Sequence, residues 1–261
     1  MKILGKLSGI KNSGLVRGIA SSGIYRRFYG SSVAHAVRSI FNKSAVSQGM
    51  KEINDFKWSG DLDELIDFSM NCSGGYIRPM QVKEEIRGLL ELVRERKVKR
   101  MVEIGTANGG TLFLFCKVIE RDAFILTMDL PFGIPGSSYQ KHKVPLYQSF
   151  AGPGQELRLF RGDSHQPETA EKIRENLGGQ ELDFLFIDGD HSYEGVKKDF
   201  EMYSQFVRKG GMIGFHDIAV HPPEKQCEVH RFWEEIKGSY EHKEFIKDKN
   251  QGGYGIGVLF K

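Results

Sequence analysis

Carboxylate and imidazole side chains gather at two places in the chain where buried strands are expected to end. Asp188, Asp190 and His191 follow one apolar run, and His216 with Asp217 follows the next. Each of these residues alone could cap a helix or pair with a surface charge, which is the simplest interpretation of Asp190. Five carboxylates and imidazoles in one small volume suit a divalent cation with a base beside it. We therefore interpret them as a candidate metal and catalytic site.

A glycine-rich stretch at residues 103–110 follows an earlier apolar run. Its small residues let the backbone turn sharply and approach a ligand closely. Ala107 stands where the dinucleotide-binding fingerprint has its second glycine, although Gly110 fills the third position. Asp129 comes 19 residues after Gly110 and is placed to accept hydrogen bonds from ribose hydroxyls. The pattern predicts a nucleoside-containing cofactor, and the alternative is a loop that only joins a strand to a helix.

Two other motifs give weaker signals. Asp163 and Ser164 follow the next expected strand, where Asp163 can hold an exocyclic amine such as that of adenine, and where either residue can cap a helix. His221, Cys227 and His230 lack the fourth ligand of a structural zinc site, so we do not expect zinc there.

Apolar runs alternate with helical patterns from about residue 80 to the end of the chain. The runs predict strands at residues 100–104, 124–129, 157–160, 182–188, 212–215, 244–246 and 255–260, and the periodicity predicts helices at 82–93, 109–119, 167–177, 193–207 and 228–237. This alternation predicts an α/β fold with a doubly wound, mostly parallel, seven-stranded Rossmann-like sheet and an antiparallel C-terminal edge strand. In such a sheet, ligands bind at the carboxyl ends of the strands, where both motifs above lie. We expect the long excursion at residues 131–156 to shape a substrate pocket.

The composition is that of an ordinary globular protein. Of the 261 residues, 39% are hydrophobic and 27% are charged, which excludes disorder as the main state. The chain has no apolar run of 18 residues, so we expect no membrane-spanning helix. Three widely spaced cysteines indicate a reducing compartment, and we expect a cytoplasmic protein.

The N-terminus differs from the rest of the chain. Residues 1–51 contain five Lys, four Arg and no acidic residue, so the remaining 210 residues carry a net charge of −6. We divide the chain into a helical basic arm, residues 1–50, and a domain, residues 51–261. The arm could lie on an anionic membrane surface, act as a transit peptide, or pack on the domain or on a second subunit. Its aromatic residues match no RNA-binding signature, and we expect no nucleic acid partner.

The motifs together resemble class I S-adenosylmethionine-dependent methyltransferases over about residues 75–261. The resemblance rests on residues 103–111, Asp129, residues 187–195, residues 210–217 and the tail at residues 227–233. The chain is similar to the branch that contains metal-dependent sugar O-methyltransferases of macrolide and aminocoumarin biosynthesis and cephalosporin-hydroxylase-like proteins.

The resemblance implies which residues bind the methyl donor. In that family the region of Glu103 and Gly105 contacts the methionine part, Asp129 the ribose and Asp163 the adenine. The implied set for the donor is Gln81, Glu103, Gly105, Thr106, Asn108, Gly109, Asp129, Asp163, Ser164 and Asp188.

The resemblance also implies a divalent cation, Mg²⁺ or Mn²⁺ with Fe²⁺ as a further option, held by Asp188, His216 and Asp217. A histidine three residues after the first ligand acts as the base in the macrolide-sugar enzymes, and His191 matches it. His216 departs from the pattern, because many relatives have an acid there. Imidazole suits Mn²⁺, Fe²⁺, Co²⁺ or Zn²⁺ better than Mg²⁺, unless His216 lies outside the coordination sphere and Mg²⁺ keeps extra waters.

The expected function is methyl transfer from S-adenosylmethionine to a hydroxyl oxygen of a small molecule or glycan that carries a sugar or catechol-like vicinal diol. His191 is the expected general base, with Asp190 as the other catalytic candidate. We expect a homo-oligomer that is peripheral to a membrane if the arm binds lipid. Two alternatives stay open: a catalytically silent cofactor-binding or assembly protein, and a nicotinamide-dependent oxidoreductase. Ala107 and the acid and histidine cluster disfavour the oxidoreductase.

Overall fold

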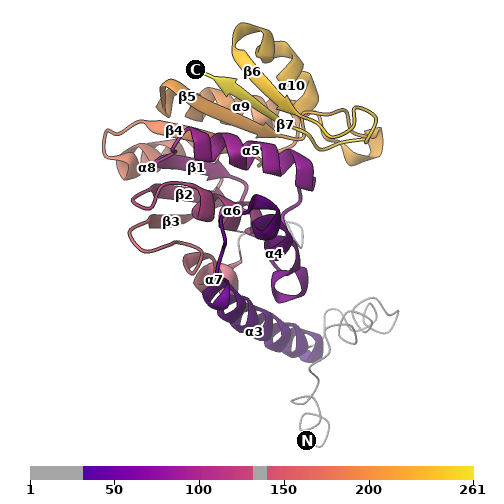
Figure 1. The fold of residues 1–261 in the computed structure, drawn as a ribbon. Helices are drawn as coiled ribbons and strands as arrows, with labels where there is room; N and C mark the ends of the chain where they lie inside the picture. Colours follow the sequence, from indigo (N-terminus) through magenta and orange to yellow (C-terminus); the bar gives the residue numbers. More distant parts are fainter. Residues whose placement is uncertain (1–31, 132–139) are drawn as a thin grey trace, which may run out of the picture.

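The computed structural model describes residues 32–131 and 140–261, and its centre is a single seven-stranded sheet with helices on both faces (Figure 1). The strand order is β3-β2-β1-β4-β5-β7-β6. The strands are β1 (Arg100–Ile104), β2 (Phe124–Asp129), β3 (Glu156–Arg161), β4 (Leu182–Ile187), β5 (Val207–His216), β6 (Glu241–Phe245) and β7 (Ile256–Phe260). The first five pair in parallel, and β7 is antiparallel to both β5 and β6. The predicted fold class is confirmed, with the closing β6–β7 hairpin at one edge.

The helices divide between the two faces of the sheet (Figure 1). One face carries α4 (Leu62–Gly75), α5 (Lys83–Glu95) and α6 (Gly110–Val118), and the other carries α8 (Pro167–Leu177), α9 (Tyr193–Tyr203) and α10 (Val229–Ile236). The short helix α7 (Val144–Gln148) lies next to α3 (Ser32–Asp55).

A hydrophobic core lies on each face of the sheet. The central strands contribute side chains to both cores, because successive side chains of a strand point to opposite faces. In β4, Phe184 and Phe186 pack with the α4–α6 layer, whereas Leu185 and Ile187 pack with the α8–α10 layer. This two-sided burial explains why the parallel strands are almost continuously apolar in the sequence.

Two helix boundaries agree with their local chemistry. The Ser192 side chain accepts a hydrogen bond from the Gly195 amide and so caps α9. Helix α8 ends at Leu177, and its C-cap residue Gly178 has a φ of 57°.

The predicted helix at residues 193–207 is one residue too long. Helix α9 stops at Tyr203 and continues as a 3₁₀ helix over Ser204–Phe206, and β5 begins at Val207, five residues before the predicted strand. Val207 pairs with Leu182, and the Gly210 amide donates to the Lys261 carbonyl. The two glycines at 210 and 211 therefore lie inside a strand that has a register shift.

Helix α3 crosses the predicted boundary between the arm and the domain at residue 50. Ala45, Val46 and Ile53 are buried, and the Ser73 hydroxyl donates to the Ala45 carbonyl at 2.7 Å. Residues 1–31, most of the arm, lie outside the described residues, so the interpretations of the arm stay predictions.

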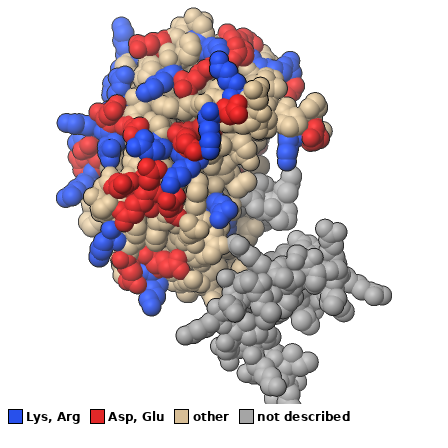
Figure 2. Space-filling model, turned by 45° about the vertical axis from the view of Figure 1, so that its right-hand side comes forward, with Lys and Arg blue, Asp and Glu red and all other residues tan. Residues whose placement is uncertain are grey.

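The surface carries both signs of charge. On the face in Figure 2, Lys and Arg side chains lie among acidic ones and form no continuous basic patch. Within the part of the chain that the structure describes, no helix is long and apolar enough to cross a membrane. All three cysteines are free and buried.

Candidate functional site

Four of the five predicted acid and histidine residues meet where β4 and β5 end. The Asp188 Oδ1 atom lies 3.0 Å from His216 Nδ1 and 3.5 Å from His191 Nε2. The Asp217 Oδ2 atom lies 3.5 Å from the Nδ1 atoms of both His216 and His191. The two carboxylates thus face both imidazoles.

Burial and charge shift the pKa values of this cluster. Burial would raise the pKa of the Asp188 carboxyl, but the neighbouring imidazoles lower it below its usual range. Burial would lower the pKa of His216, but Asp188 and Asp217 raise it to about 9. A hydrogen bond with Asp188 raises the pKa of His191, whose side chain is 46% exposed. Without a cation, the protonated His216 imidazole offsets part of the negative charge of the two carboxylates.

The same cluster has the donor set of a metal site. Asp188, His216 and Asp217 each offer one ligand atom, and these atoms lie within 4.8 Å of one another. The Nε2 atom of His216 is buried and has no hydrogen-bond partner among the described residues. Two carboxylates and one imidazole fit a divalent cation such as Mn²⁺ or Fe²⁺.

His221 supports Asp217 from the other side, which sequence reasoning missed. Its Nε2 atom lies 3.0 Å from Asp217 Oδ1, so each oxygen of that carboxylate faces an imidazole. Asp217 itself has a φ of 64°, a left-handed conformation that Asp tolerates better than most residues. The only available signal was the spacing of four residues after Asp217, which is not specific.

Asp190, the second catalytic candidate, caps a turn. Its Oδ1 atom accepts the Ser192 amide at 2.9 Å, and a Cβ atom added to Gly195 would lie 2.2 Å from its carboxyl carbon. Its carboxylate therefore lies against the first turn of α9.

The glycine-rich loop after β1 is held tightly against Asp188 and Asp129. Gly105 has a φ of 97°, and a Cβ atom there would lie 1.9 Å from the Asp188 carbonyl oxygen, so only glycine fits. The Asp129 carboxylate accepts the Ala107 amide at 2.8 Å and the Leu130 amide at 2.7 Å. Asp129 thus fixes the loop and lies at the end of β2.

A small cavity lies between this loop and the segment before α5. It is lined by Arg78, Pro79, Met80, Gln81, Gly105, Thr106, Ala107, Asn108, Gly109, Gly110, Thr111 and Asp188. Six of the predicted donor residues are in this lining: Gln81, Gly105, Thr106, Asn108, Gly109 and Asp188. Of the remaining lining residues, Arg78 and Met80 were missed, because an irregular segment before a helix carries no periodic signal.

Gln81 connects the cavity with the acid and histidine cluster. Its Nε2 atom donates to Asp188 Oδ2 at 2.9 Å, and its Oε1 atom accepts the Thr111 hydroxyl at 2.8 Å. Asp188 is therefore shared by the cavity, through Oδ2, and by the cluster, through Oδ1.

Glu103 is fully buried behind the loop and is not among the residues that line the cavity. It accepts the Thr127 hydroxyl at 2.5 Å, and Thr127 lies 2.6 Å from the Thr106 hydroxyl. Burial raises the pKa of Glu103 to about 8, and Asp188 and Asp129 add to that increase. Glu103 is therefore connected to the cavity through the hydrogen bonds of the Thr127 and Thr106 hydroxyl groups.

Asp163 and Ser164 lie at the end of β3, outside the cavity lining. Asp163 accepts the His165 amide and the Gln166 side chain, and the Ser164 carbonyl accepts the Tyr203 hydroxyl. Both residues belong to the turn that leads into α8, but neither side chain caps the N-terminus of that helix.

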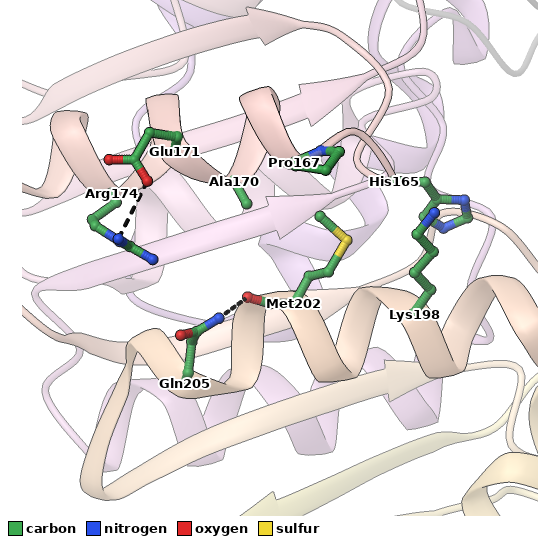
Figure 3. Close-up of a pocket in the computed structure, with 8 residues that line it drawn as sticks. All are labelled: His165, Pro167, Ala170, Glu171, Arg174, Lys198, Met202 and Gln205. Atoms are coloured by element: carbon green, nitrogen blue, oxygen red, sulfur yellow. Dashed lines mark hydrogen bonds and ion pairs between the residues drawn. The ribbon is translucent and has the colours of Figure 1, made fainter.

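A larger surface hollow lies between α8 and α9 (Figure 3). Its lining consists of His165, Pro167, Ala170, Glu171, Arg174, Lys198, Met202 and Gln205. None of the predicted site residues is in this lining, and Arg174 pairs with Glu171 in it. We assign it no part in the site.

Sequence reasoning also missed Lys143, which comes from the excursion between β2 and β3. It is buried, and its Nζ atom donates to Asn108 Oδ1 at 3.1 Å. Burial lowers the pKa of Lys143 to about 8. The excursion also places the Tyr147 hydroxyl on the Ala107 carbonyl at 2.7 Å. Residues 132–139 of the excursion lie outside the described residues, but the remainder does support the glycine-rich loop.

Comparison with known families gives a match to the same part of the chain. Residues 102–218 match a family model described as a methyltransferase domain. An uncharacterised protein of Acanthamoeba polyphaga mimivirus is 34% identical over 117 residues, 44% of this chain and 50% of that protein. An uncharacterised protein of Sinorhizobium fredii is 24% identical over 176 residues, 65% of this chain and 18% of that protein. The chain therefore spans half or less of the length of these two relatives.

Solved structures share the fold. The O-methyltransferase TomG of Streptomyces achromogenes, in complex with S-adenosylmethionine, has a TM-score of 0.52 at 16% identity and covers 80% of this chain and 93% of its own. An O-methyltransferase of Bacillus cereus, in complex with S-adenosylhomocysteine, has a TM-score of 0.52 at 18% identity. The match covers 79% of this chain and 93% of the Bacillus chain. A putative O-methyltransferase of Klebsiella pneumoniae has a TM-score of 0.53 at 18% identity. The match covers 79% of this chain and 92% of the Klebsiella chain.

These findings confirm the resemblance to class I S-adenosylmethionine-dependent methyltransferases. The sheet has that fold, and the matched segment runs from β1 to just beyond Asp217, so it contains the glycine-rich loop and the whole acid and histidine cluster.

Proposed function

We propose that this protein transfers the methyl group of S-adenosylmethionine to a hydroxyl oxygen of a small molecule or glycan. The observation that carries the proposal is the position of Asp188. One of its carboxylate oxygens faces the cavity beside the glycine-rich loop, and the other faces the acid and histidine cluster. A donor in the cavity and a hydroxyl at the cluster would then be neighbours, as methyl transfer requires.

The donor would bind at the cavity at the end of β1. The positive sulfonium suits a cavity with Asp188 in its wall, and Asp129 at the end of β2 is placed for ribose hydroxyls. Two of the solved structures with this fold contain S-adenosylmethionine or S-adenosylhomocysteine, which supports this choice of cofactor.

The cluster would prepare the acceptor. Asp188 and Asp217, with His216, would hold a divalent cation, which when bound would polarise the acceptor hydroxyl. His191 is the residue of the cluster most accessible to solvent, so it would take the hydroxyl proton as the oxygen forms its bond to the methyl group. The products are the methyl ether, S-adenosylhomocysteine and a proton on the imidazole. Asp190 contributes to the turn before α9 rather than to this step.

A vicinal diol of a sugar is the acceptor that the resemblance favours, and a catechol-like diol is the second candidate. The nicotinamide-dependent alternative predicts different binding: in a thermal shift measurement, S-adenosylmethionine should raise the melting temperature and NAD should not. The catalytically silent alternative keeps the cofactor pocket, so the metal tests it instead: divalent metal retained by the purified protein would count against it.

Titration calorimetry with Asp129→Ala tests the cofactor assignment. Loss of a charged acceptor for the ribose, and of the anchor for the Ala107 amide, should weaken S-adenosylmethionine binding by about 1–3 kcal/mol. Asp122→Ala is the matched control, because Asp122 is an exposed acid that pairs with Lys99 at the opposite end of β2. Equal donor affinity in both variants would rule out the proposed cofactor position.

A further inference from the structure

A second group of metal-ligating atoms lies beside the cluster and differs from it in chemistry. His191, Asp217 and Cys227 each offer one ligand atom, and these atoms lie within 4.8 Å of one another. The first group offers one nitrogen and two oxygens, whereas this group offers a nitrogen, an oxygen and a sulfur. Asp217 belongs to both groups.

The chain places Cys227 here through contacts far from it in sequence. The Glu228 amide donates to the His191 carbonyl at 2.8 Å, which ties the segment before α10 to the end of β4. Cys227 is 7% exposed and lies in the turn that leads into α10. His191 remains the accessible member, so an ion can reach the group from the solvent side.

Hard cations such as Mg²⁺ and Mn²⁺ prefer oxygen ligands, whereas Zn²⁺ and Cd²⁺ bind imidazole and thiolate well. Three protein ligands with a fourth position left for water are also the usual ligand count of an open zinc site. We propose that His191, Asp217 and Cys227 form a second metal position, selective for thiophilic divalent cations such as Zn²⁺ and Cd²⁺. As the metal–sulfur bond forms, the thiol proton leaves to the solvent.

Occupation of this position has a consequence for the reaction, which rests on the proposed function. His191 cannot ligate an ion and accept a proton with the same nitrogen, and Asp217 cannot serve both positions fully. A thiophilic cation here would therefore inhibit methyl transfer, whereas a cation at Asp188, His216 and Asp217 would support it.

The test uses the full chain and two metal probes. Cd²⁺ binding is followed by the ultraviolet absorption of the cadmium–thiolate bond, and Mn²⁺ binding by electron paramagnetic resonance. Cys227→Ser should remove the cadmium–thiolate band and weaken Cd²⁺ binding by about 100-fold or more, because a ligand is lost outright. The same variant should bind Mn²⁺ within about twofold of the wild type, since Cys227 is not in the first group.

Two matched variants complete the design. Cys116→Ser changes a buried cysteine of α6 that lies in neither metal group, and it should keep the cadmium–thiolate band. Asp188→Asn should weaken Mn²⁺ binding and leave the band in place. A cadmium–thiolate band that survives in Cys227→Ser, or that disappears in Cys116→Ser, would overturn the proposal. Both readouts are independent of methyl transfer, so they decide the site even if the protein proves to have another activity.

Discussion

Changing Gln81 to Glu tests whether Asp188 is the charged centre that links the cavity with the cluster. The Gln81 side chain is buried and lies 2.9 Å from Asp188 Oδ2 through its donating amide nitrogen. Gln81→Glu keeps the shape of the side chain and its contact with the Thr111 hydroxyl, but replaces the donor with a carboxyl group. Two buried carboxylates at this distance cannot both stay ionised, so the pair retains a proton.

The magnitude follows from that proton. A free Glu side chain has a pKa of about 4.3, and each unit of pKa difference corresponds to about 1.4 kcal/mol. If the pair still holds its proton at pH 7, the variant loses at most about 3.7 kcal/mol of folding free energy relative to pH 4.3. In the folded variant the pKa of the carboxyl pair is raised above that of a free Glu. The free energy of unfolding is therefore unaffected by the pair below about pH 4.3 and falls as pH rises toward the folded pKa.

Urea denaturation of wild type and variant at pH 5.0 and pH 7.0 measures this difference. The gap in unfolding free energy should widen by about 2–3 kcal/mol between the two pH values. Gln48→Glu is the matched control, because Gln48 donates to the Glu52 carboxylate at 2.7 Å on an exposed helix surface. Solvent screens that pair, so the control should change by less than about 0.5 kcal/mol at both pH values. A Gln81→Glu variant that behaves like the control would refute a buried, ionised Asp188.

Three further predictions concern the base, the buried imidazole and the arm. His191→Ala should leave donor and Mn²⁺ affinity near wild type and lower turnover by about 10²–10⁴-fold in a methyl transfer assay, the usual contribution of a positioned base; unchanged turnover would exclude His191 as the base. The pKa of His216 is raised to about 9, so its contribution to metal-free stability is complete below about pH 6.5 and is lost as pH rises through about 9. The stability advantage of wild type over His216→Gln should therefore shrink over that range in denaturant titrations, and a constant difference would contradict the pairing with Asp188 and Asp217. Removal of residues 1–31 should leave the melting temperature near that of the full chain, whereas removal of residues 1–50 should lower it, because the longer deletion takes away buried Ala45 and Val46; equal melting temperatures would show that α3 adds no stability.

The sequence alone was sufficient for the architecture and for the neighbourhood of the site. Apolar runs long enough for two-sided burial located the strands, and the parallel arrangement requires their carboxyl ends to share one edge. For that reason Asp188 and Asp217 could be placed together without a structure, although they are 29 residues apart. The role of Gly105 could also be predicted from the sequence, because a strand that turns sharply into a helix needs a residue without a side chain at the turn.

Only the tertiary structure could decide which side chains face one another. Asp190 and His191 are adjacent in sequence, yet one turns toward the first turn of α9 and the other toward Asp217, since the local backbone after β4 sends them in different directions. Gln81 meets Asp188 across 107 residues, and Glu228 holds Cys227 beside His191, through contacts that no periodicity encodes. The early start of β5 was decided in the same way, because Val207 pairs with Leu182 of the neighbouring strand. Local patterns specify which elements form, whereas the partners of a buried polar group depend on the packing of elements that are distant in sequence.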